Sequence, residues 1–273
     1  MGRIHEALQR AEEQREKLGG TPGGPASARE IVDRPAEPRG LVGGRLRGGL
    51  LRAARRARVV LSDSESAVTE QYRSLRARIQ SIRRTRPLRT IVVTSALAGE
   101  GKTTTAVNLA LSFGLDPERE TCLVDADLRT PAVHRAFAEL PPAGLAELLE
   151  GEAKLEEVLV RVPDTRLWVL PVRSLPAHPA ELLSSRRMVR LLEELSERFE
   201  TVLIDSPPVL GLPDSTTLVD LADATLLVIA RGIASRSDLE AALERIDAGK
   251  VLGSVFNRAA DAPPVYGSGR GSS

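Results

Sequence analysis

The chain has 273 residues, enough for one or two domains, and its 38 Lys and Arg nearly balance its 37 Asp and Glu. The resulting net charge of +1 indicates no particular partner, and a single cysteine excludes a disulfide framework. No apolar run approaches the roughly 18 residues that a membrane span requires, and the charged start MGRIHEALQRAEEQRE is not a signal peptide. We therefore expect a cytoplasmic protein whose contacts with a membrane are peripheral.

The first 60 residues are expected to lie outside the folded domain. Residues 1–18 have a thin apolar stripe among many charges, which predicts a short charged helix, and residues 19–60 are rich in Gly, Pro and Arg, which predicts a flexible linker. Within this linker, residues 39–58 hold seven arginines and no acid. Such a run could contact anionic lipid or nucleic acid, or serve only for solubility. Without interleaved aromatic side chains it gives no clear nucleic-acid signal.

A folded domain is predicted over residues 61–258. Ser62 and Glu65 have the spacing of a capping box, so we expect a helix carrying TEQYRSLRARIQSIRR to follow them. Six apolar runs of strand length come next: TIVVTSA, TCLVDA, LWVLPV, TVLIDSP, ATLLVIA and KVLGSVFN. They are continuous rather than alternating, as expected for strands that are buried on both faces.

Helical patterns separate these strands, namely TTTAVNLALSFGL, AGLAELLEG with KLEEVLVRV, AELLSSRRMVRLLEELSERF and SRSDLEAALERID. Strand–helix alternation of this kind predicts an α/β fold with a doubly wound, mostly parallel sheet flanked by helices. Residues 259–273 end in GSGRGSS and are expected to form a disordered tail that carries Tyr266.

The segment TIVVTSALAGEGKTTTAVNLA carries the strongest motif of the chain. Its residues 96–103 match the P-loop pattern, except that Ala96 replaces the first glycine, and a predicted strand leads in while a predicted helix leads out. The glycines let the backbone turn so that successive amides face phosphate oxygens, and the lysine adds a positive charge. We therefore expect a P-loop NTPase that binds ATP. The residues expected to bind the nucleotide are Ala98, Gly99, Glu100, Gly101, Lys102, Thr103 and Thr104.

Three acids stand where apolar runs end. Asp125 and Asp127 follow TCLV, and Asp205 ends TVLID. Ligands bind at this edge of open α/β sheets, and acids that gather there are costly unless they share a cation. A Mg²⁺-bound nucleotide supplies that cation, so the predicted metal-binding residues are Thr103, Asp125 and Asp205.

These three segments, in this order, resemble the Walker A, A′ and B motifs of the bacterial tyrosine kinases, or BY-kinases. The A′ pattern of three apolar residues and D-x-D-x-R is found as CLVDADLR, with Arg129 last, and the B pattern as DSPP. The resemblance runs from about residue 66 to residue 257. It implies a protein-tyrosine (auto)kinase that uses ATP and Mg²⁺ and that regulates exopolysaccharide or capsule polymerisation and export.

The expected catalytic residues of such a kinase are Lys102, Asp125, Asp127 and Arg129. Lys102 would neutralise phosphate charge, and Asp127 would accept the tyrosine proton or orient the hydroxyl, with support from Arg129. The resemblance implies an acceptor tyrosine in the tail of a neighbouring subunit. This chain lacks the tyrosine cluster of the family, and Tyr266 is the one tyrosine in its tail.

The segment EQYRSLR gives Glu70, Arg73 and Arg76, which match the E-x-x-R-x-x-R motif of ring-like self-association in this family. On a helix this spacing places the charges along one stripe, with Glu70 and Arg73 close enough to pair. The alternative is a solvated helix face. The resemblance further implies a homo-oligomer and a membrane-embedded activator of the polysaccharide co-polymerase type, which would hold the chain at the inner face of the plasma membrane.

Two other functions remain open at this point. A ParA- or MinD-like ATPase switch resembles the chain in fold, but those proteins carry a second lysine early in the P-loop, where this chain has Leu97. A nucleotide-binding adaptor of a polysaccharide export complex, without transfer activity, would suit the sparse tail tyrosines. The intact set of Asp125, Asp127 and Asp205 opposes the adaptor.

Overall fold

The computed structural model describes residues 66–137, 140–211 and 214–259. The expected helix over residues 1–18, the linker over residues 19–60, the Ser62–Glu65 pair and Tyr266 lie outside the described residues. The expected domain over residues 61–258 is therefore described almost to its limits, and everything below concerns that part of the chain.

The first described element is helix α4 (Ala67–Arg83). Its N-cap is Ser66, whose hydroxyl accepts a hydrogen bond from the Thr69 amide at 3.2 Å. The helix predicted around TEQYRSLRARIQSIRR is confirmed, but the cap is Ser66 and not Ser62, because Ser66 stands directly before the first helical turn. The helix packs inward through an apolar stripe at helical spacing, made of Tyr72, Leu75, Ile79 and Ile82.

Within the described ranges, seven strands form one sheet in the order β3-β4-β2-β5-β1-β6-β7. Their bounds are β1 (Thr90–Ser95), β2 (Thr121–Asp125), β3 (Val160–Arg161), β4 (Leu167–Leu170), β5 (Thr201–Asp205), β6 (Ala224–Ala230) and β7 (Val251–Asn257). All neighbours are parallel except β3, which pairs antiparallel with β4. The six predicted strands and the mostly parallel sheet are confirmed.

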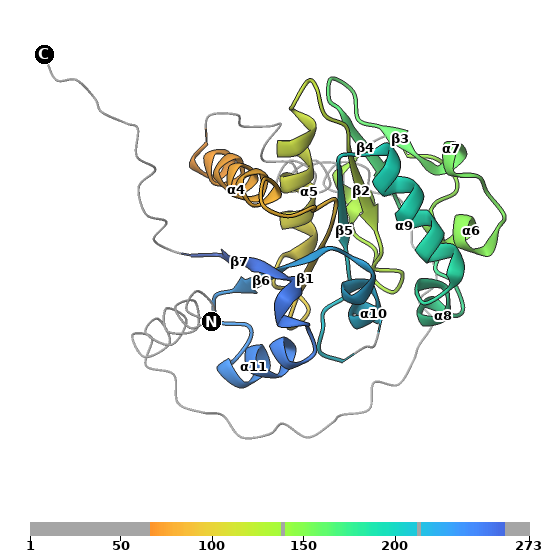
Figure 1. Cartoon of the computed structure of the whole chain (residues 1–273). Coiled ribbons are helices and arrows are strands. Elements are labelled where there is room, and N and C mark those ends of the chain that lie inside the picture. The colour runs from red at the N-terminus through yellow and green to blue at the C-terminus, as the bar shows by residue number, and fades with distance from the viewer. Residues whose placement is uncertain (1–65, 138–139, 212–213, 260–273) are drawn as a thin grey trace, which may run out of the picture.

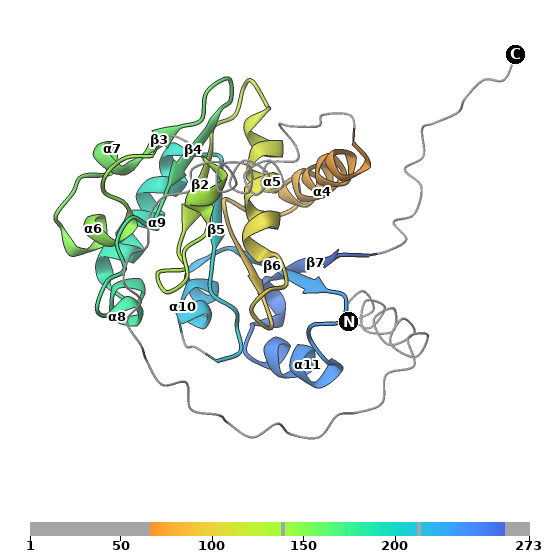
Figure 2. The same cartoon turned by 180° about the vertical axis from the view of Figure 1, so that it is seen from behind.

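Helices cover both faces of this sheet (Figures 1 and 2). Along β1, Ile91 and Val93 join the core cluster formed with α4 and α5 (Lys102–Gly114), whereas Val92 joins the cluster on the opposite face. Alternate residues of a strand point to opposite faces, which is why an uninterrupted apolar run serves two cores. The opposite face is covered by α6 (Leu145–Glu150), α7 (Leu155–Val158), α8 (Pro179–Leu183), α9 (Arg186–Arg198), α10 (Asp214–Leu221) and α11 (Arg236–Glu244).

Two helix predictions are wrong in detail, and α10 was not predicted. The segment KLEEVLVRV is helical only as far as Val158, after which β3 pairs with β4 at the edge of the sheet, where β-branched residues fit well. The segment AELLSSRRMVRLLEELSERF forms α8 and α9 rather than one helix. The break lies at Ser185, whose hydroxyl accepts from the Met188 amide at 3.2 Å and so caps a new helix.

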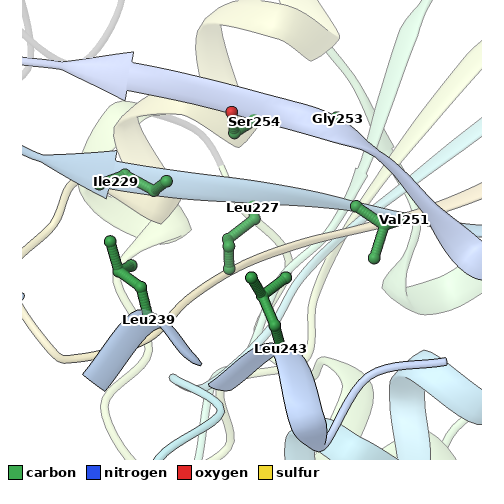
Figure 3. A pocket seen from close by; sticks show the side chains of 7 residues that line it. All are labelled: Leu227, Ile229, Leu239, Leu243, Val251, Gly253 and Ser254. Atoms are coloured by element: carbon green, nitrogen blue, oxygen red, sulfur yellow. The ribbon is translucent and has the colours of Figure 1, made fainter. Parts of the chain in front are cut away.

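A small apolar pocket separates α11 from the last two strands. Leu239 and Leu243 point from α11 toward Leu227 on β6 and Val251 on β7 (Figure 3). The pocket is lined by Leu227, Ile229, Leu239, Leu243, Val251, Gly253 and Ser254. The small residues Gly253 and Ser254 of β7 lie along one side of this space.

Candidate functional site

The P-loop and the strand-end acids meet at one edge of the sheet. β5 lies between β1 and β2, so the strand that leads into the P-loop has Asp205 on the adjacent strand and Asp125 on the strand after that. Asp125 and Asp205 are register partners on adjacent parallel strands. Lys102 begins α5, directly after the P-loop. The structure thus brings together predicted residues that lie more than one hundred positions apart in the sequence.

The P-loop has a shape that suits an anion. Gly99 and Gly101 have φ angles of 83° and 91°, a left-handed conformation that costs a glycine little. Gly101 is the N-cap of α5, and no side chain caps this helix. Among the described residues, no main-chain hydrogen bond outside α5 uses the amides of residues 99–104. These amides and the positive end of the helix dipole form a cradle for phosphate.

Glu100 contributes to this cradle only through its main chain. Its carboxylate is buried and accepts hydrogen bonds from the Leu97 amide at 2.8 Å and from the Ala230 amide, at the end of β6, at 3.1 Å. Burial raises the pKa of this carboxyl, against the lowering effect of those amides. The side chain therefore braces the loop against the sheet, which the motif alone did not indicate.

Leu97 also points inward. It packs, partly buried, against the core cluster on the α6–α11 face. The position at which ParA- and MinD-like proteins carry a second lysine thus serves the core in this chain.

Lys102 and Asp127 form an ion pair across the site. The Lys102 ammonium lies 3.2 Å from the Asp127 carboxylate, and both side chains are largely buried. Asp127 also accepts hydrogen bonds from the Thr130 amide at 2.9 Å and from the Thr130 hydroxyl at 3.1 Å. In this arrangement Asp127 is the counter-ion of the P-loop lysine, and Thr130 fixes its orientation.

Asp205 and Asp125 carry poorly compensated charge. Asp205 is completely buried, neither of its carboxylate oxygens accepts a hydrogen bond of normal geometry from the described residues, and burial raises its pKa to about 7. The nearby Lys102 ammonium and Thr103 hydroxyl act in the opposite direction and lower this pKa. The pKa of Asp125 is raised by burial and then by the charge of Asp205, although its oxygens accept from the Val133 and Asp127 amides.

These residues fit a shared divalent cation. Two buried carboxylates on adjacent strands, with a hydroxyl beside one of them, are the hard oxygen donors that Mg²⁺ prefers. In the described parts of the chain no three His, Cys, Asp or Glu side chains form a complete metal site by themselves. This agrees with Mg²⁺ chemistry, because the ion commonly takes one or two protein carboxylates and completes its shell with phosphate oxygens and water.

Arg129 forms an ion pair with Asp214, a partner that the sequence did not indicate. Its Nε lies 2.7 Å from the Asp214 carboxylate at the start of α10, and Asp214 is buried while about a third of Arg129 stays exposed. The hydrogen bond to Asp214 raises the pKa of Arg129 and holds the guanidinium, and the charge of Asp127 acts on this pKa in the same direction. The two residues are 85 positions apart, so only the fold could reveal the pair.

The end of β7 supplies two further contacts. The Asn257 side-chain amide donates to the Glu100 carbonyl at 2.9 Å, and the Arg258 guanidinium donates to the Gly99 carbonyl at 2.9 Å. Sequence reasoning placed both residues at the end of a strand but gave them no role. The signal that was available was a polar pair directly after the apolar run KVLGSVF.

Glu70, Arg73 and Arg76 lie on α4, outside this site. Glu70 and Arg73 form an ion pair and are each about 40% exposed, with values of 39% and 41%. Arg76 instead donates to the Ser112 carbonyl of α5. The predicted stripe is therefore divided: two charges remain at the surface, and the third ties α4 to α5.

Tyr72 is directed into the same interface. Burial raises the pKa of its phenol, and the Thr105 side chain on α5 is its hydrogen-bond partner. This hydroxyl is thus engaged between α4 and α5.

Comparisons with known proteins agree with this geometry. The family model of the AAA domain matches residues 88–251. The tyrosine-protein kinase YwqD of Bacillus subtilis is 35% identical over 201 residues, which cover 73% of this chain and 84% of YwqD. The tyrosine-protein kinase CpsD of Streptococcus agalactiae is 30% identical over 203 residues, which cover 73% of this chain and 86% of CpsD.

Solved structures give the same result. The chimerical protein CapA2B2 is similar with a TM-score of 0.70 and 28% identity, covering 74% of this chain and 90% of that one. The kinase domain of the Escherichia coli tyrosine kinase ETK is similar with a TM-score of 0.68 and 25% identity, covering 76% and 83%. The cell division ATPase MinD of Pyrococcus furiosus is less similar, with a TM-score of 0.52 and 27% identity, covering 64% and 76%. The P-loop NTPase fold predicted from the sequence is confirmed.

Proposed function

Since this chain belongs to the bacterial tyrosine-protein kinases, we propose that its P-loop site binds ATP with Mg²⁺ and transfers the γ-phosphoryl group to a protein tyrosine. The observation that carries the proposal is the convergence of Lys102 with Asp125, Asp127 and Asp205 at one edge of the sheet. The Leu97 side chain, turned to the core, favours this kinase over a ParA- or MinD-like switch.

The proposed roles follow from the contacts. The amides of residues 98–104 and the Lys102 ammonium bind the phosphates, while Thr103, Asp125 and Asp205 face the cation. Bound Mg²⁺ supplies positive charge that neutralises the phosphate oxygens. Because the buried acids repel one another, part of the free energy of binding comes from relief of that repulsion.

The transfer step uses Asp127 as the base. The phenolic oxygen of the tyrosine forms a bond to the γ-phosphorus, the bond from that phosphorus to the oxygen that bridges it to the β-phosphate breaks, and ADP leaves with the electron pair. The phenolic proton passes to Asp127. Asp127 is paired with Lys102 in the free protein, and it becomes available to the phenol when the phosphates attract the Lys102 ammonium. Arg129, held by Asp214, stabilises charge on the transferred group.

Tyr266 is the proposed acceptor. The chain has two tyrosines, and the hydroxyl of Tyr72 is engaged between α4 and α5. Arg258, which stands eight residues before Tyr266 in the sequence, donates to the Gly99 carbonyl of the P-loop. We assign Tyr266 to the site of a neighbouring subunit, as the family resemblance implies.

Intact mass spectrometry tests the function. Wild-type protein incubated with ATP and Mg²⁺ is expected to gain one phosphoryl group per chain, while Lys102→Met gains none and Tyr266→Phe loses the gain on the tail. A wild-type mass that is unchanged after ATP contradicts the kinase and supports the nucleotide-binding adaptor. ATP hydrolysis without any change of protein mass supports the ATPase switch.

The biological setting is proposed on the same basis. Among the described helices, none combines the length and apolar character needed to cross a bilayer. We assign the chain to the cytoplasmic face of the plasma membrane, held there by a membrane-embedded activator of the polysaccharide co-polymerase type, where it regulates exopolysaccharide or capsule export as a ring-like homo-oligomer. Residues 61–258 form the proposed kinase domain. Co-purification of the chain with a membrane fraction only when the activator is present is the expected result.

A further inference from the structure

Two side chains at the end of β7 donate hydrogen bonds to main-chain carbonyls of the P-loop. The Asn257 Nδ2 donates to the Glu100 carbonyl and the Arg258 Nη2 donates to the Gly99 carbonyl, each at 2.9 Å. Both contacts join residues more than 150 positions apart. The Glu100 carboxylate also stabilises the loop, because it accepts hydrogen bonds from the Leu97 and Ala230 amides.

The two carbonyls belong to consecutive peptide groups. In a planar trans peptide the C=O and the N–H point in opposite directions. Arg258 holds the carbonyl of the Gly99–Glu100 peptide, so the Glu100 amide points away from Arg258. Asn257 holds the next carbonyl, so the Gly101 amide points away from Asn257. Two successive N–H groups are thereby directed to the side of the loop opposite β7.

Gly101 is adapted to this contact. A Cβ atom at this position would collide with the Asn257 side-chain amide. Gly101 therefore meets two requirements at once: the φ angle of 91°, and close approach by Asn257.

Arg258 is itself held in place. It has a φ angle of 58°, which is uncommon for a residue with a side chain, and its amide donates to the Asn257 Oδ1 at 2.9 Å. The Asn257 carbonyl accepts from the Arg231 amide at 3.1 Å, which ties this turn to the end of β6. The turn directs the guanidinium to the P-loop carbonyl, while the residue as a whole stays exposed.

We propose that Asn257 and Arg258 are positioning residues of the phosphate site, which orient two P-loop amides before a nucleotide arrives. The proposal rests on the proposed function, because it assigns those amides to phosphate binding. Its consequence is selective: the loss of either side chain lets the peptide groups rotate, which weakens binding of phosphates and leaves other parts of the nucleotide unaffected.

The test compares the dissociation constants of ADP with Mg²⁺ and of adenosine, by calorimetric or fluorescence titration. For Arg258→Ala we expect about tenfold weaker ADP binding, as for one lost charge-assisted hydrogen bond, and unchanged adenosine binding. Asn257→Ala is expected to show the same selectivity. Saturating ATP should restore the phosphotyrosine rate of Arg258→Ala, because the defect lies in KM and not in kcat.

Arg86→Ala is the matched control. Arg86 also donates to two main-chain carbonyls, those of Gly249 and Asp223, but not to the P-loop. ADP binding by this variant should equal that of the wild type, and melting temperatures show that each variant is folded.

Three results would contradict either the role of a positioning residue or the kinase function. Wild-type ADP affinity in Arg258→Ala overturns the proposal for that residue. An equal loss of adenosine and ADP binding in Asn257→Ala shows a contact with the base and overturns the proposal for Asn257. A wild-type protein that binds ADP with Mg²⁺ but forms no phosphotyrosine overturns the kinase function alone, since amide orientation concerns only binding.

Discussion

We expect Asp205 to set how nucleotide binding depends on pH. Its carboxyl is fully buried and has a pKa of about 7, so near neutral pH a proton competes with the cation. Because this pKa is raised to about 7, the Asp205 carboxyl of the free protein is protonated below pH 7 and ionised above it. Binding of ADP with Mg²⁺ should therefore strengthen about tenfold from pH 6 to pH 8, since one proton must leave below the pKa and none above it.

The Asp205→Asn variant isolates this effect. The titration of the nucleotide itself is common to both proteins, so the difference between them reports Asp205 together with the effect of its charge on Asp125. Calorimetry at pH 6, 7 and 8 should find weaker Mg²⁺-dependent binding in the variant and a shallower dependence on pH. Parallel pH curves for the two proteins would show that Asp205 is not where proton and cation compete.

Arg129 and Asp214 are expected to act as a unit. The buried Asp214 fixes the guanidinium at 2.7 Å, and an arginine freed from it samples many rotamers. We expect Arg129→Ala and Asp214→Asn each to lower the phosphotyrosine rate by about tenfold or more, and the double variant to be no slower than the worse single one.

Rates measured at saturating ATP complete this double-mutant cycle. Arg135→Ala is the control, since Arg135 is an exposed arginine six residues further along the chain, in the short 3-10 helix Val133–Ala136, and its rate should match the wild type. Additive losses in the double variant would show that the two side chains contribute independently.

At the scale of elements, the packing of α11 is vulnerable because a pocket already adjoins it (Figure 3). Leu239 is 1% exposed and points from α11 toward β6. Leu239→Ala enlarges the pocket, and the expected loss in free energy of unfolding is about 2–5 kcal/mol. Leu175→Ala, at a leucine that is 65% exposed, should change it by less than about 0.5 kcal/mol. Urea unfolding of both variants measures this, and equal losses would contradict the packing argument.

Strands proved easier to predict than short helices, for a physical reason. The runs at β1, β2, β5 and β6 must be apolar on both faces because helices cover both, so the pattern is unmistakable. The division between α8 and α9 depends on one capping hydroxyl, that of Ser185, and β3 depends on pairing with β4. Neither the capping hydroxyl nor the pairing of β3 with β4 produces a periodic pattern in the sequence.

At the scale of the whole molecule, the sequence indicated which residues would lie together at one edge of the sheet but not which contacts hold them there. Lys102, Asp125, Asp127 and Asp205 could be predicted because strand ends of a parallel sheet share one edge. The bracing contacts join distant segments, and no local pattern encodes the meeting of Asp214 with Arg129 or of Arg258 with Gly99. The order of strands in the sheet creates those meetings.

Self-association of the whole molecule can be tested by substitutions on the surface of α4. Glu70 and Arg73 pair with each other at the surface, whereas Arg76 binds the Ser112 carbonyl inside the subunit. The double substitution Glu70→Arg with Arg73→Glu keeps the pair within the helix but reverses the charges offered to a neighbour. We expect sedimentation velocity to show monomers for this variant and an unchanged melting temperature.

Two further variants separate a surface role from a structural one. Arg78→Glu alters an exposed charge elsewhere on α4 and should leave the oligomer intact. Arg76→Ala should lower the melting temperature, because it removes the tie between α4 and α5. If the reversed pair assembles like the wild type, the interface either lies elsewhere or pairs Glu70 of one subunit with Arg73 of the next, because reversal in every subunit keeps that pairing attractive. Loss of assembly in the reversed variant shows that the neighbour offers other residues to these two charges.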